Sequence, residues 1–592
     1  MSGLQSHDLY KICSGLLLAI HGQKKFSTAE PGFREVGAHF RHNVQDLHRR
    51  IKVLSFDGAA GSGEQQIHRV TAGLFPDRID LANQRCGIGR KAHRCQLVKE
   101  ALETRVVLVS QGQAGLPEQK HDNQKQLPHD MHARLGILGF QAAFKMKLTR
   151  REFGLLSAAL PLFSVDAMAA ETDVVVVGAG VAGLAAAQVI ANAGRRVQVI
   201  EAAPRVGGRC YTDFASFGMP FDQGAMWLRD ATHNPVHGFA LLYKFQTALP
   251  RPKEILFANG RAAPPKATDA YERAYDAFSL AMAEAAEEDV DIAAGAVAWP
   301  KLDEGANEWL YTAASQIGAL DMGTDLSSIS VKDWFYRDEA EPIRLVKQGL
   351  GTLVARLAES LPVAISTVAR RIVSAAQGRV FVVTNRGEIA TKAVIVTPSI
   401  GVLASESISF EPGLTSDMQS ALSGLQMGAM LKIALAFDAN SAAMKFEANS
   451  VLLAQSADER GAEFFMRPFG FPMAICTVGG SAALDLEAQG ERTQRDYAIE
   501  SLRRMLGSNS GQGLHGAAST SWSRNPLTLG SVACVKPGHL GARQALQTPI
   551  NDNVFLAGEA LAGKQVQTVH GAYENGRQAA RRVLRFLKSR PG

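Results

Sequence analysis

Four consecutive valines, Val174–Val177, form a short apolar run without alternation. Such a run is typical of a parallel strand that is buried on both faces. Val197–Ile200 is a second short apolar run, and Val394–Thr397, which ends before Pro398, is a third. Residues 270–289 instead carry their apolar side chains at helical spacing, which predicts a long amphipathic helix. We therefore expect buried parallel strands connected by helices, the pattern of an α/β fold.

The first predicted strand leads directly into a glycine-rich turn. Gly178, Gly180 and Gly183 fit GxGxxG, in which the first glycine allows a tight turn and the second lets the backbone approach a pyrophosphate. The third lets the following helix pack closely on the strand. Val181 and Ala182 stand at the start of that helix, where unpaired N–H groups and the helix dipole favour phosphate. The turn predicts a dinucleotide site, although a lone GxGxxG also occurs in ordinary tight loops.

An acidic residue supports the dinucleotide interpretation. Glu201 follows the second predicted strand, 18 positions after Gly183, and Ala202 comes next. A carboxylate at this place accepts hydrogen bonds from ribose hydroxyls and disfavours a 2′-phosphate. These residues argue against NADP and leave FAD and NAD open.

Later motifs decide between the two cofactors. Gly207-Gly208-Arg209 follows the acid, and with four further segments it resembles the flavin-dependent amine oxidase superfamily. That superfamily includes monoamine oxidases, polyamine oxidases and histone lysine demethylases, and the resemblance implies FAD as the cofactor. The four segments are Asp222–Trp227, Val346–Gly349, Phe555–Glu559 and Thr568–Ala572.

The resemblance implies an α/β fold with a Rossmann-like FAD-binding domain and an inserted α+β substrate domain. Because the motifs alternate with other material, both domains are discontinuous along the chain. We expect the FAD-binding domain in residues 171–237, 343–402 and 520–590, and the substrate-binding domain in residues 238–342 and 403–519. The long amphipathic helix falls in the substrate-binding domain.

In this family the last helix directs its N-terminus at the pyrimidine ring of the flavin, where the reduced flavin carries negative charge. Thr568 and Val569 stand at that helix start, Thr568 also suits an N-cap, and His570 is expected to be structural. The residues that we assign to the FAD site are Gly178, Gly180, Val181, Ala182, Gly183, Glu201, Ala202, Gly207, Gly208, Arg209, Gly224, Ala225, Met226, Trp227, Val368, Gly558, Glu559, Thr568, Val569 and Ala572.

Lys432 is the residue to which the resemblance assigns a catalytic role. It lies in Met427–Ile433, which resembles the family strand whose lysine holds a water beside flavin N5. A partly desolvated lysine with a lowered pKa suits the orientation of that water. We expect Ile433, Leu435 and Phe437 to share its face of the strand and to desolvate it. A solvated surface lysine is the alternative.

The reaction implied by the resemblance is the oxidation of an amine. A hydride passes from the carbon beside a neutral amine nitrogen to flavin N5, the imine is hydrolysed, and O2 reoxidises the flavin to give H2O2. Val532 and Ala533 stand where relatives carry a tyrosine or a flavin-linked cysteine, so we expect FAD to be bound without a covalent link at that position. Thr568 stands where monoamine oxidases have the other tyrosine of their aromatic cage. The substrate pocket is therefore expected to differ from theirs.

Other flavoenzymes resemble this chain as well. L-amino-acid oxidases and tryptophan monooxygenases bind the substrate carboxylate with an arginine at the position of Trp227, so an amine is favoured unless Arg229 takes that role. Core packing is an equally good interpretation of Trp227. A desaturase-like or protoporphyrinogen-oxidase-like flavoprotein remains open. So does a flavin-binding protein without turnover, since Asn525 replaces the usual aspartate.

Charge and histidine content separate the first part of the chain from the rest. Residues 1–145 hold 20 of the 63 Lys and Arg residues, 13 of the 57 Asp and Glu residues and 10 of the 15 histidines. The net charge of +6 therefore comes from this part, and the remainder is close to neutral. The segment has no zinc-ligand spacing and no basic stripe with interleaved aromatics, so we expect no metal site and no nucleic acid.

Residues 146–170 have the order of a twin-arginine export signal. Arg150 and Arg151 precede the apolar stretch Leu155–Val165, and Ala167–Ala169 supplies small residues for cleavage. The apolar stretch is too short to cross a bilayer, so we expect no stable membrane anchor.

A signal of this kind begins a chain, so we hypothesise that translation starts at Met146. Residues 1–145 are then a miscalled or disordered extension, and the twin-arginine machinery exports a folded bacterial flavoenzyme to the periplasm; otherwise we expect it in the cytoplasm. The mature protein keeps Cys210, Cys476 and Cys534, which imply no disulfide framework. The expected partners are an amine, O2 and the export machinery, and a homodimer is considered.

Overall fold

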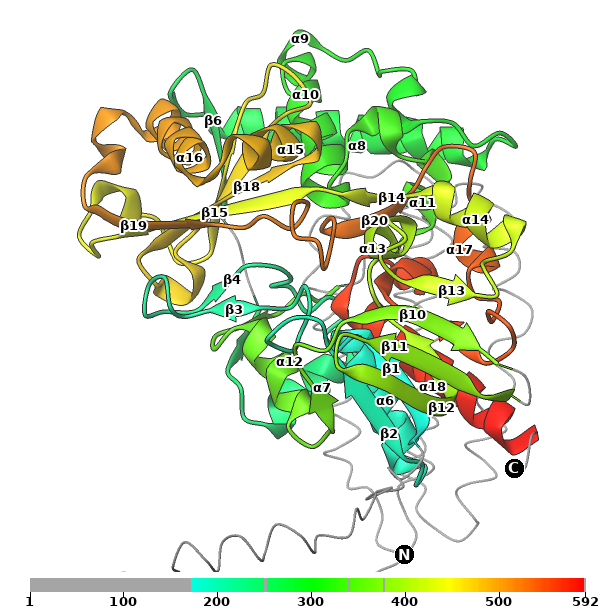
Figure 1. Ribbon diagram of the computed structural model, residues 1–592. Coiled ribbons are helices and arrows are strands. Elements are labelled where there is room, and N and C mark those ends of the chain that lie inside the picture. Colours follow the sequence, from blue (N-terminus) through cyan, green and yellow to red (C-terminus); the bar gives the residue numbers. More distant parts are fainter. Residues whose placement is uncertain (1–171, 250–252, 339–340, 376–377, 590–592) are drawn as a thin grey trace, which may run out of the picture. The chain divides into compact units, whose positions relative to one another are not determined.

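The structure is a computed structural model that describes residues 172–249, 253–338, 341–375 and 378–589 (Figure 1). The described residues belong to one compact unit. The expectations for residues 1–145 and for the export signal at 146–170 lie outside the described residues.

A sheet that is mainly parallel around its centre forms the first part of the fold. In the described residues it has eight strands in the order β13-β10-β11-β12-β1-β2-β9, and β21 also pairs with β12. The central strand β1 lies parallel between β12 and β2. The strands are β1 (Thr172–Val177), β2 (Val197–Ile200), β9 (Val363–Ala364), β10 (Ala369–Ser374), β11 (Val380–Thr384), β12 (Gly387–Val396), β13 (Ser409–Glu411) and β21 (Val554–Leu556).

The valine run is buried on both faces, as its composition predicts. Val174 and Val176 belong to the apolar core on one side of the sheet, and Val175 and Val177 belong to the core on the other. The first core contains side chains of α6 (Val181–Asn192), α12 (Leu350–Ala358) and α18 (Val569–Ser589). The second contains side chains of α13 (Ile400–Ala404), α14 (Ser416–Ser423) and α17 (Ala542–Ala545).

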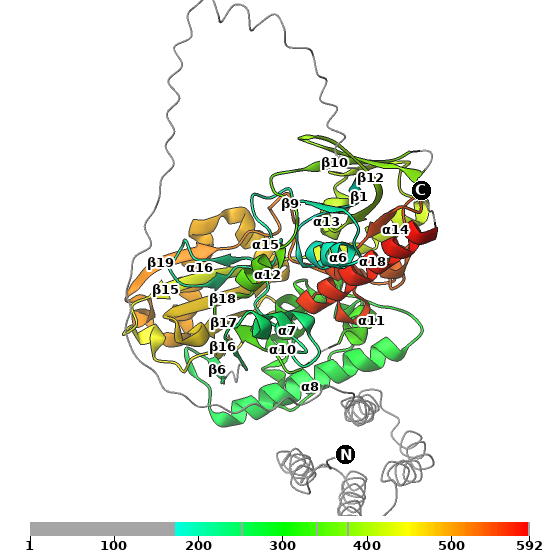
Figure 2. The ribbon, with the colours of Figure 1, turned by 90° about the horizontal axis from the view of Figure 1, so that it is seen from below.

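Helices α6 and α18 lie side by side (Figure 2). A Cβ atom at Gly576 of α18 would stand 2.0 Å from the carbonyl oxygen of Ala182, so a glycine is required for this approach. This contact joins the start of α6 to a point two turns inside α18. Short α7 (Pro235–Leu242) also packs on α18.

A second sheet lies in the upper part of Figure 1. In the described residues it has seven strands in the order β19-β15-β18-β17-β16-β6-β7. One face is buried under α15 (Gly480–Gln489) and α16 (Glu491–Leu506). The strands are β6 (Glu254–Ala258), β7 (Arg261–Ala262), β15 (Met430–Phe437), β16 (Ser450–Ala454), β17 (Ala462–Met466), β18 (Met473–Gly479) and β19 (Leu514–Ser519).

The long helix α8 (Pro265–Glu287) confirms the amphipathic pattern, since Phe278 and Met282 are fully buried. It packs with α10 (Leu310–Ser315) and α11 (Val331–Tyr336), and α10 continues into the π-helix η3 (Gln316–Leu320). The remaining helical turns are α9 (Glu304–Asn307), η2 (Ala294–Ala296), η4 (Leu326–Ser328), η6 (Ala442–Met444), η7 (Pro468–Gly470), η8 (Ser508–Gly511), η9 (Glu559–Leu561) and η10 (Gly563–Gln565).

Three two-stranded sheets complete the described fold: β3 (Thr212–Asp213) with β4 (Phe221–Asp222), β5 (Thr247–Ala248) with β8 (Leu345–Val346), and β14 (Leu425–Gly428) with β20 (Val532–Val535). The α/β class is confirmed. The eight-stranded sheet also takes β13 from beyond residue 402, where we placed the end of the second FAD-binding segment. The helices of the described segments include none that is long and apolar enough to cross a membrane.

Candidate active site

The turn between β1 and α6 leaves open space at its middle glycine. A Cβ at Gly178 would stand 2.4 Å from the Thr397 hydroxyl oxygen, and one at Gly183 would stand 1.9 Å from the Gly178 carbonyl oxygen. A Cβ at Gly180 would meet nothing within 4 Å, and Gly180 gives α6 no side-chain cap. The first N–H groups of a helix have no partner within it, so Val181 and Ala182 offer donors beside this space. The turn fits the phosphates of a dinucleotide.

Glu201 is held at the end of β2 by two backbone donors. Its Oε2 accepts from the Ala179 N–H at 2.7 Å and its Oε1 from the Ala203 N–H at 2.8 Å. The residues around Val368 come alongside, because the Thr367 N–H donates to the Glu201 carbonyl. A carboxylate with two fixed donors keeps lone pairs for further hydroxyl groups, as a ribose would supply. Ala202, next in the chain, is half-buried.

The Gly207-Gly208-Arg209 element joins this turn to the C-terminal part of the chain. The Gly207 N–H donates to the Ala179 carbonyl at 2.9 Å, and Gly207 forms a bridge with Gly180. The Arg209 guanidinium pairs with Glu559 at 2.9 Å and donates to the Ser531 carbonyl at 2.7 Å. The β1–α6 turn and the C-terminal residues Ser531 and Glu559 are thereby connected through one short segment.

The start of α18 completes this side of the site. The Thr568 hydroxyl accepts from the Gly571 N–H at 3.0 Å, which confirms Thr568 as an N-cap. Val569 is buried and Ala572 packs on the same core. The two ring nitrogens of His570 are buried without a hydrogen-bond partner among the described residues, and burial lowers its pKa. His570 is therefore neutral at pH 7.

Lys432 reaches from the second sheet to the Asp222–Trp227 segment. Its Nζ donates to the Gly224 carbonyl at 2.5 Å and to the Asp222 carbonyl at 3.2 Å. Burial lowers the pKa of Lys432 to about 8. The solvated alternative is therefore wrong, and the expected desolvation is confirmed.

The expected cause of that desolvation was wrong. Ile433, Leu435 and Phe437 lie in the core on the opposite face of β15, under α15 and α16. Residues that alternate along a strand share a face, so Lys432 lies on the face of Ala434. That face meets the Asp222–Trp227 segment, and this segment removes water from the lysine.

The Asp222–Trp227 segment is anchored by its own carboxylate. Asp222 accepts from the N–H groups of Leu350 and Gly351 at 3.0 and 3.3 Å and from the Thr212 hydroxyl at 2.6 Å. Burial raises the pKa of Asp222, and these donors oppose that effect. The segment is thus fixed to the start of α12. Its Asp222 and Gly224 carbonyls are thereby held in place as acceptors for Lys432.

The rest of this segment packs tightly on its neighbours. A Cβ at Gly224 would stand 1.8 Å from the Arg209 carbonyl oxygen, and the Ala225 N–H donates to that oxygen at 3.1 Å. Met226 is buried, and the Trp227 ring contacts the Phe465 ring edge-on with centroids 5.3 Å apart. Gly224 to Trp227 therefore connect the two sheets.

Sequence reasoning missed Glu463. Its strand β17 lies beside β18, and the register places Lys432, Thr477 and Glu463 in one row across three strands. Gln316 of η3 donates to the carboxylate at 3.4 Å, and burial raises the pKa of Glu463 to about 6. The available signal was a single charge within the otherwise apolar strand AEFFM.

Sequence reasoning also did not predict that Arg229, Arg337 and Asp321 form one cluster of ion pairs. Arg337 pairs with Asp321, and Arg229 lies 3.6 Å from it. Burial alone would raise the pKa of Asp321, but the two guanidinium groups hold it below its ordinary value. Arg337 also donates to Gln567 at 3.1 Å, so the group reaches the residue before Thr568. Arg229, considered above as a carboxylate ligand, is engaged with Asp321.

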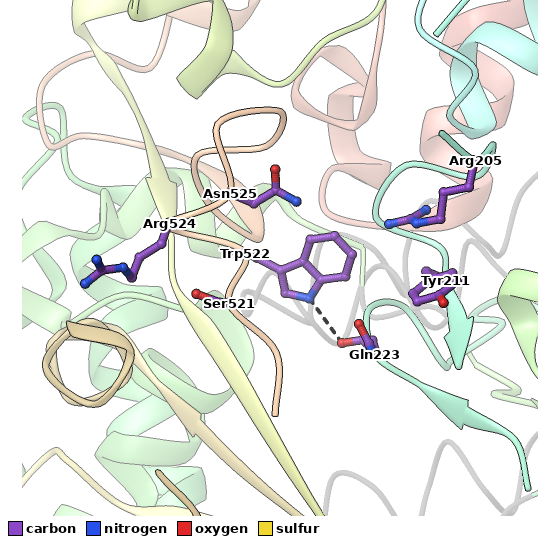
Figure 3. Close-up of a pocket in the computed structure, with 7 residues that line it drawn as sticks. All are labelled: Arg205, Tyr211, Gln223, Ser521, Trp522, Arg524 and Asn525. Carbon is purple, nitrogen blue, oxygen red and sulfur yellow. Dashed lines mark hydrogen bonds between the residues drawn. The ribbon is translucent and has the colours of Figure 1, made fainter. Parts of the chain in front are cut away.

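A pocket of about 410 Å³ opens beside the backbone that holds Lys432 (Figure 3). The Trp522 indole donates to the Gln223 carbonyl at 3.1 Å, and the Arg205 guanidinium lies 4.1 Å from the centroid of the Tyr211 ring. Asn525, which replaces the usual aspartate, accepts from the Leu527 N–H at 2.9 Å and so caps its own turn. The lining residues are Arg205, Tyr211, Gln223, Ser521, Trp522, Arg524 and Asn525.

The described residues fit a dinucleotide flavin along this path. The open space at Gly180 and the uncapped start of α6 suit the phosphates, and Glu201 suits the ribose. Lys432 lies at the Gly224 segment, and the residue before Thr568 is connected to Arg209 through Glu559. The three cysteines of the described segments, Cys210, Cys476 and Cys534, are buried free thiols, and those segments contain no cluster of ligands suited to a metal.

Comparisons with known proteins agree with this arrangement. The family model described as "Flavin containing amine oxidoreductase" matches residues 181–288 and 266–584, and that of "Pyridine nucleotide-disulphide oxidoreductase" matches residues 144–217. Polyamine oxidase 5 of Oryza sativa subsp. japonica is 27% identical over 481 residues, which cover 74% of this chain and 93% of the relative. Probable polyamine oxidase 4 of Arabidopsis thaliana is 29% identical over 458 residues, which cover 71% and 89%.

Among solved structures, cyclohexylamine oxidase from Brevibacterium oxydans IH-35A has the same fold, with a TM-score of 0.58. It is 18% identical, and the match covers 71% of this chain and 100% of that chain. The family match spans most of the chain and includes helix α6, Lys432 and the start of α18. The chain therefore belongs to the flavin-containing amine oxidoreductases and is an amine oxidoreductase that uses a flavin.

Proposed function

We propose that this protein is an oxidase of a small-molecule amine and that its flavin is FAD, held without a covalent link. The observation that carries the proposal is Lys432, whose Nζ is held by the Gly224 and Asp222 carbonyls at the end of the dinucleotide path. The chemistry that a bound flavin supplies is acceptance of a hydride from the carbon beside the amine nitrogen, with return of the electrons to O2 as H2O2.

The chain's own residues bind the cofactor and orient a water molecule for the reaction. The N–H groups at the start of α6 hold the phosphates and Glu201 holds the ribose. The dipole at the start of α18 favours negative charge at the other end of the cofactor. Lys432, with a pKa of about 8, holds a water at Nζ and takes up a proton as that water attacks the imine.

An amine is favoured over an amino acid by two features. Trp227 stands where amino-acid-oxidising relatives are expected to carry an arginine, and its ring packs on Phe465. Arg229, the other candidate for a carboxylate, lies beside Asp321. The names of the relatives, polyamine oxidases and a cyclohexylamine oxidase, support an amine as well.

The test uses purified protein with bound flavin and a panel of amines and L-amino acids. We expect anaerobic bleaching of the flavin by at least one amine, and one equivalent of peroxide per imine product after oxygen is admitted. Acid precipitation should leave the flavin in the supernatant. A protein whose flavin is bleached by no amine would refute the oxidase, and a flavin that precipitates with the chain would refute non-covalent binding.

We also propose that translation starts at Met146 and that the twin-arginine machinery exports the protein to the periplasm. The support is the order of Arg150-Arg151, the apolar stretch 155–165 and the small residues 167–169. N-terminal sequencing of protein from native cells tests this proposal, and light scattering of the same sample tests the homodimer. Recovery of peptides from residues 1–140 would contradict the start at Met146.

A further inference from the structure

Asp222 and Glu463 lie close enough to act on the charge of Lys432, Asp321 lies close enough to act on Glu463, and the three carboxylates differ in what they bind. Asp222 accepts two backbone N–H groups and a hydroxyl. Asp321 is matched by the guanidinium groups of Arg229 and Arg337. Glu463 has one side-chain donor among the described residues, the Gln316 amide at a long 3.4 Å. An ionised carboxylate has about four acceptor positions, so Glu463 keeps most of its capacity.

Glu463 lies on the same face of the sheet as Lys432, so its free acceptor positions are on the side of the candidate site. The strand register places it in the same row as Lys432, two strands away, and neighbouring strands lie about 5 Å apart, so the two lie about 10 Å apart at the backbone. Both are on the face turned away from the core under α15 and α16. Glu463 is half-buried and desolvation raises its pKa, so part of its surface stays open while most of the carboxylate is shielded from water.

Thr477 of β18 lies between Lys432 and Glu463 in this row, and aromatic residues lie beside it. Phe465 lies two positions after Glu463 on the same face of β17, and it contacts Trp227 of the segment that holds Lys432. The π-helical turn η3 brings Gln316 over the row from the other side, and π-helical turns occur often at functional sites. A molecule that lies along this row meets a lysine, the Thr477 side chain and a carboxylate, with the Phe465 and Trp227 rings beside them.

We propose that Glu463 determines substrate specificity by binding a second, protonated nitrogen of the amine substrate, so that the preferred substrates are diamines rather than monoamines. The inference rests on the proposed amine oxidase function and adds a residue and a substrate class to it. A buried carboxylate with one weak donor gains a charge-assisted hydrogen bond from such a nitrogen, and a monoamine of equal length leaves it unpaired.

The experiment compares n-hexylamine with hexamethylenediamine, which has the same carbon chain and a second amine. The readout is the concentration that half-saturates anaerobic flavin bleaching, together with the limiting rate. We expect the wild type to require about tenfold less diamine than monoamine, as one charge-assisted hydrogen bond provides. Glu463→Gln should remove this preference, so that the half-saturating concentration of hexamethylenediamine rises about tenfold to that of n-hexylamine.

Matched variants separate binding from other roles. Glu463→Asp keeps the charge and should keep part of the preference. Glu447→Gln removes an exposed carboxylate before β16 of the same sheet and should change neither amine. An equal loss for both amines in Glu463→Gln would overturn the proposal, because it would mean that Glu463 acts on Lys432 or on the fold. Equal half-saturation for the two amines in the wild type would overturn it while leaving the oxidase intact.

The wild type gives a readout that does not depend on a variant. The diamine preference should be present above pH 6 and should fall as Glu463 is protonated below it. In Glu463→Asp the preference should be lost at a lower pH than in the wild type, because an aspartate is protonated at lower pH than a glutamate. A wild-type preference that is constant from pH 5 to 8 would contradict the assignment. The titratable groups that act on Glu463 or respond to it are Lys432, Glu254, Asp321, Tyr271 and Cys476.

Discussion

At the scale of single residues, Lys432 combines two hydrogen bonds to backbone carbonyls with a lowered pKa. We expect Lys432→Met to reduce the limiting rate of amine oxidation by about 100-fold, the usual contribution of a positioned acid or base. The flavin should stay bound, because the α6 turn and Glu201 are expected to hold its phosphates and ribose, and the hydrogen bonds of Lys432 go instead to the Asp222 and Gly224 carbonyls. Lys445→Met, which changes an exposed lysine of the same domain, is the control. Full activity of Lys432→Met would remove its assigned role.

The pKa of Lys432 sets a second expectation at this scale. Burial disfavours the charged form, so Nζ loses its proton as the pH rises through about 8. Only the neutral Lys432 side chain can take a proton from water. The limiting rate at saturating substrate should therefore rise through pH 8 and level off above it. A pH series from 6 to 10 on wild type and Lys432→Met measures this. The rise should be absent from the variant, and a rise shared by both would belong to another group.

At the scale of elements, the β1–α6 turn contains one glycine with open space at its Cβ position and another that is packed against the backbone. Gly180 has an extended backbone with negative φ and open space at its Cβ position, so Gly180→Ala should fold normally. The added methyl group occupies the approach of the phosphates, and we expect flavin affinity to fall about tenfold or more. Gly238→Ala, in α7 and equally open, should leave flavin binding unchanged. Flavin titration of the apoproteins measures both.

Gly183→Ala should fail in a different way. Its Cβ would stand 1.9 Å from the Gly178 carbonyl oxygen, so α6 cannot remain on β1 without movement of the backbone. We expect a loss of about 2 kcal/mol in the free energy of unfolding of the apoprotein, as overpacking typically costs. Urea unfolding beside Gly180→Ala provides the comparison. Equal stability of the two variants would contradict the distinction.

These elements also show what could be predicted from the sequence. The β1–α6–β2 unit was predictable because its strand run, glycines and acid act on neighbours within 30 residues. The row of Lys432, Thr477 and Glu463 was not, because it depends on the register of three antiparallel strands that are separated along the chain. The face of Lys432 was assigned wrongly for a simpler reason: Ile433 is its direct neighbour, and direct neighbours in a strand point to opposite faces.

At the scale of the whole molecule, one buried ion pair joins parts of the chain that are far apart in sequence. Asp333 of α11 receives two hydrogen bonds, at 3.1 and 2.9 Å, from Arg543 of α17. Arg543 also donates to the Ala560 carbonyl at 2.6 Å in η9, and Asp333 accepts from the Val535 N–H at 3.0 Å. Both side chains are buried, so neither can exchange its partner for water.

We expect Arg543→Leu to lower the free energy of unfolding by about 3 kcal/mol, because it leaves the Asp333 carboxylate buried without its cation. Replacing both residues by leucine should recover part of that loss, since no charge is then left unpaired. Arg356→Leu, which breaks an exposed pair with Glu359, should leave the unfolding midpoint unchanged. Urea unfolding followed by tryptophan fluorescence gives all three values. If Arg543→Leu unfolds at the same urea concentration as Arg356→Leu, the ion pair between α11 and α17 does not contribute to the stability of the fold.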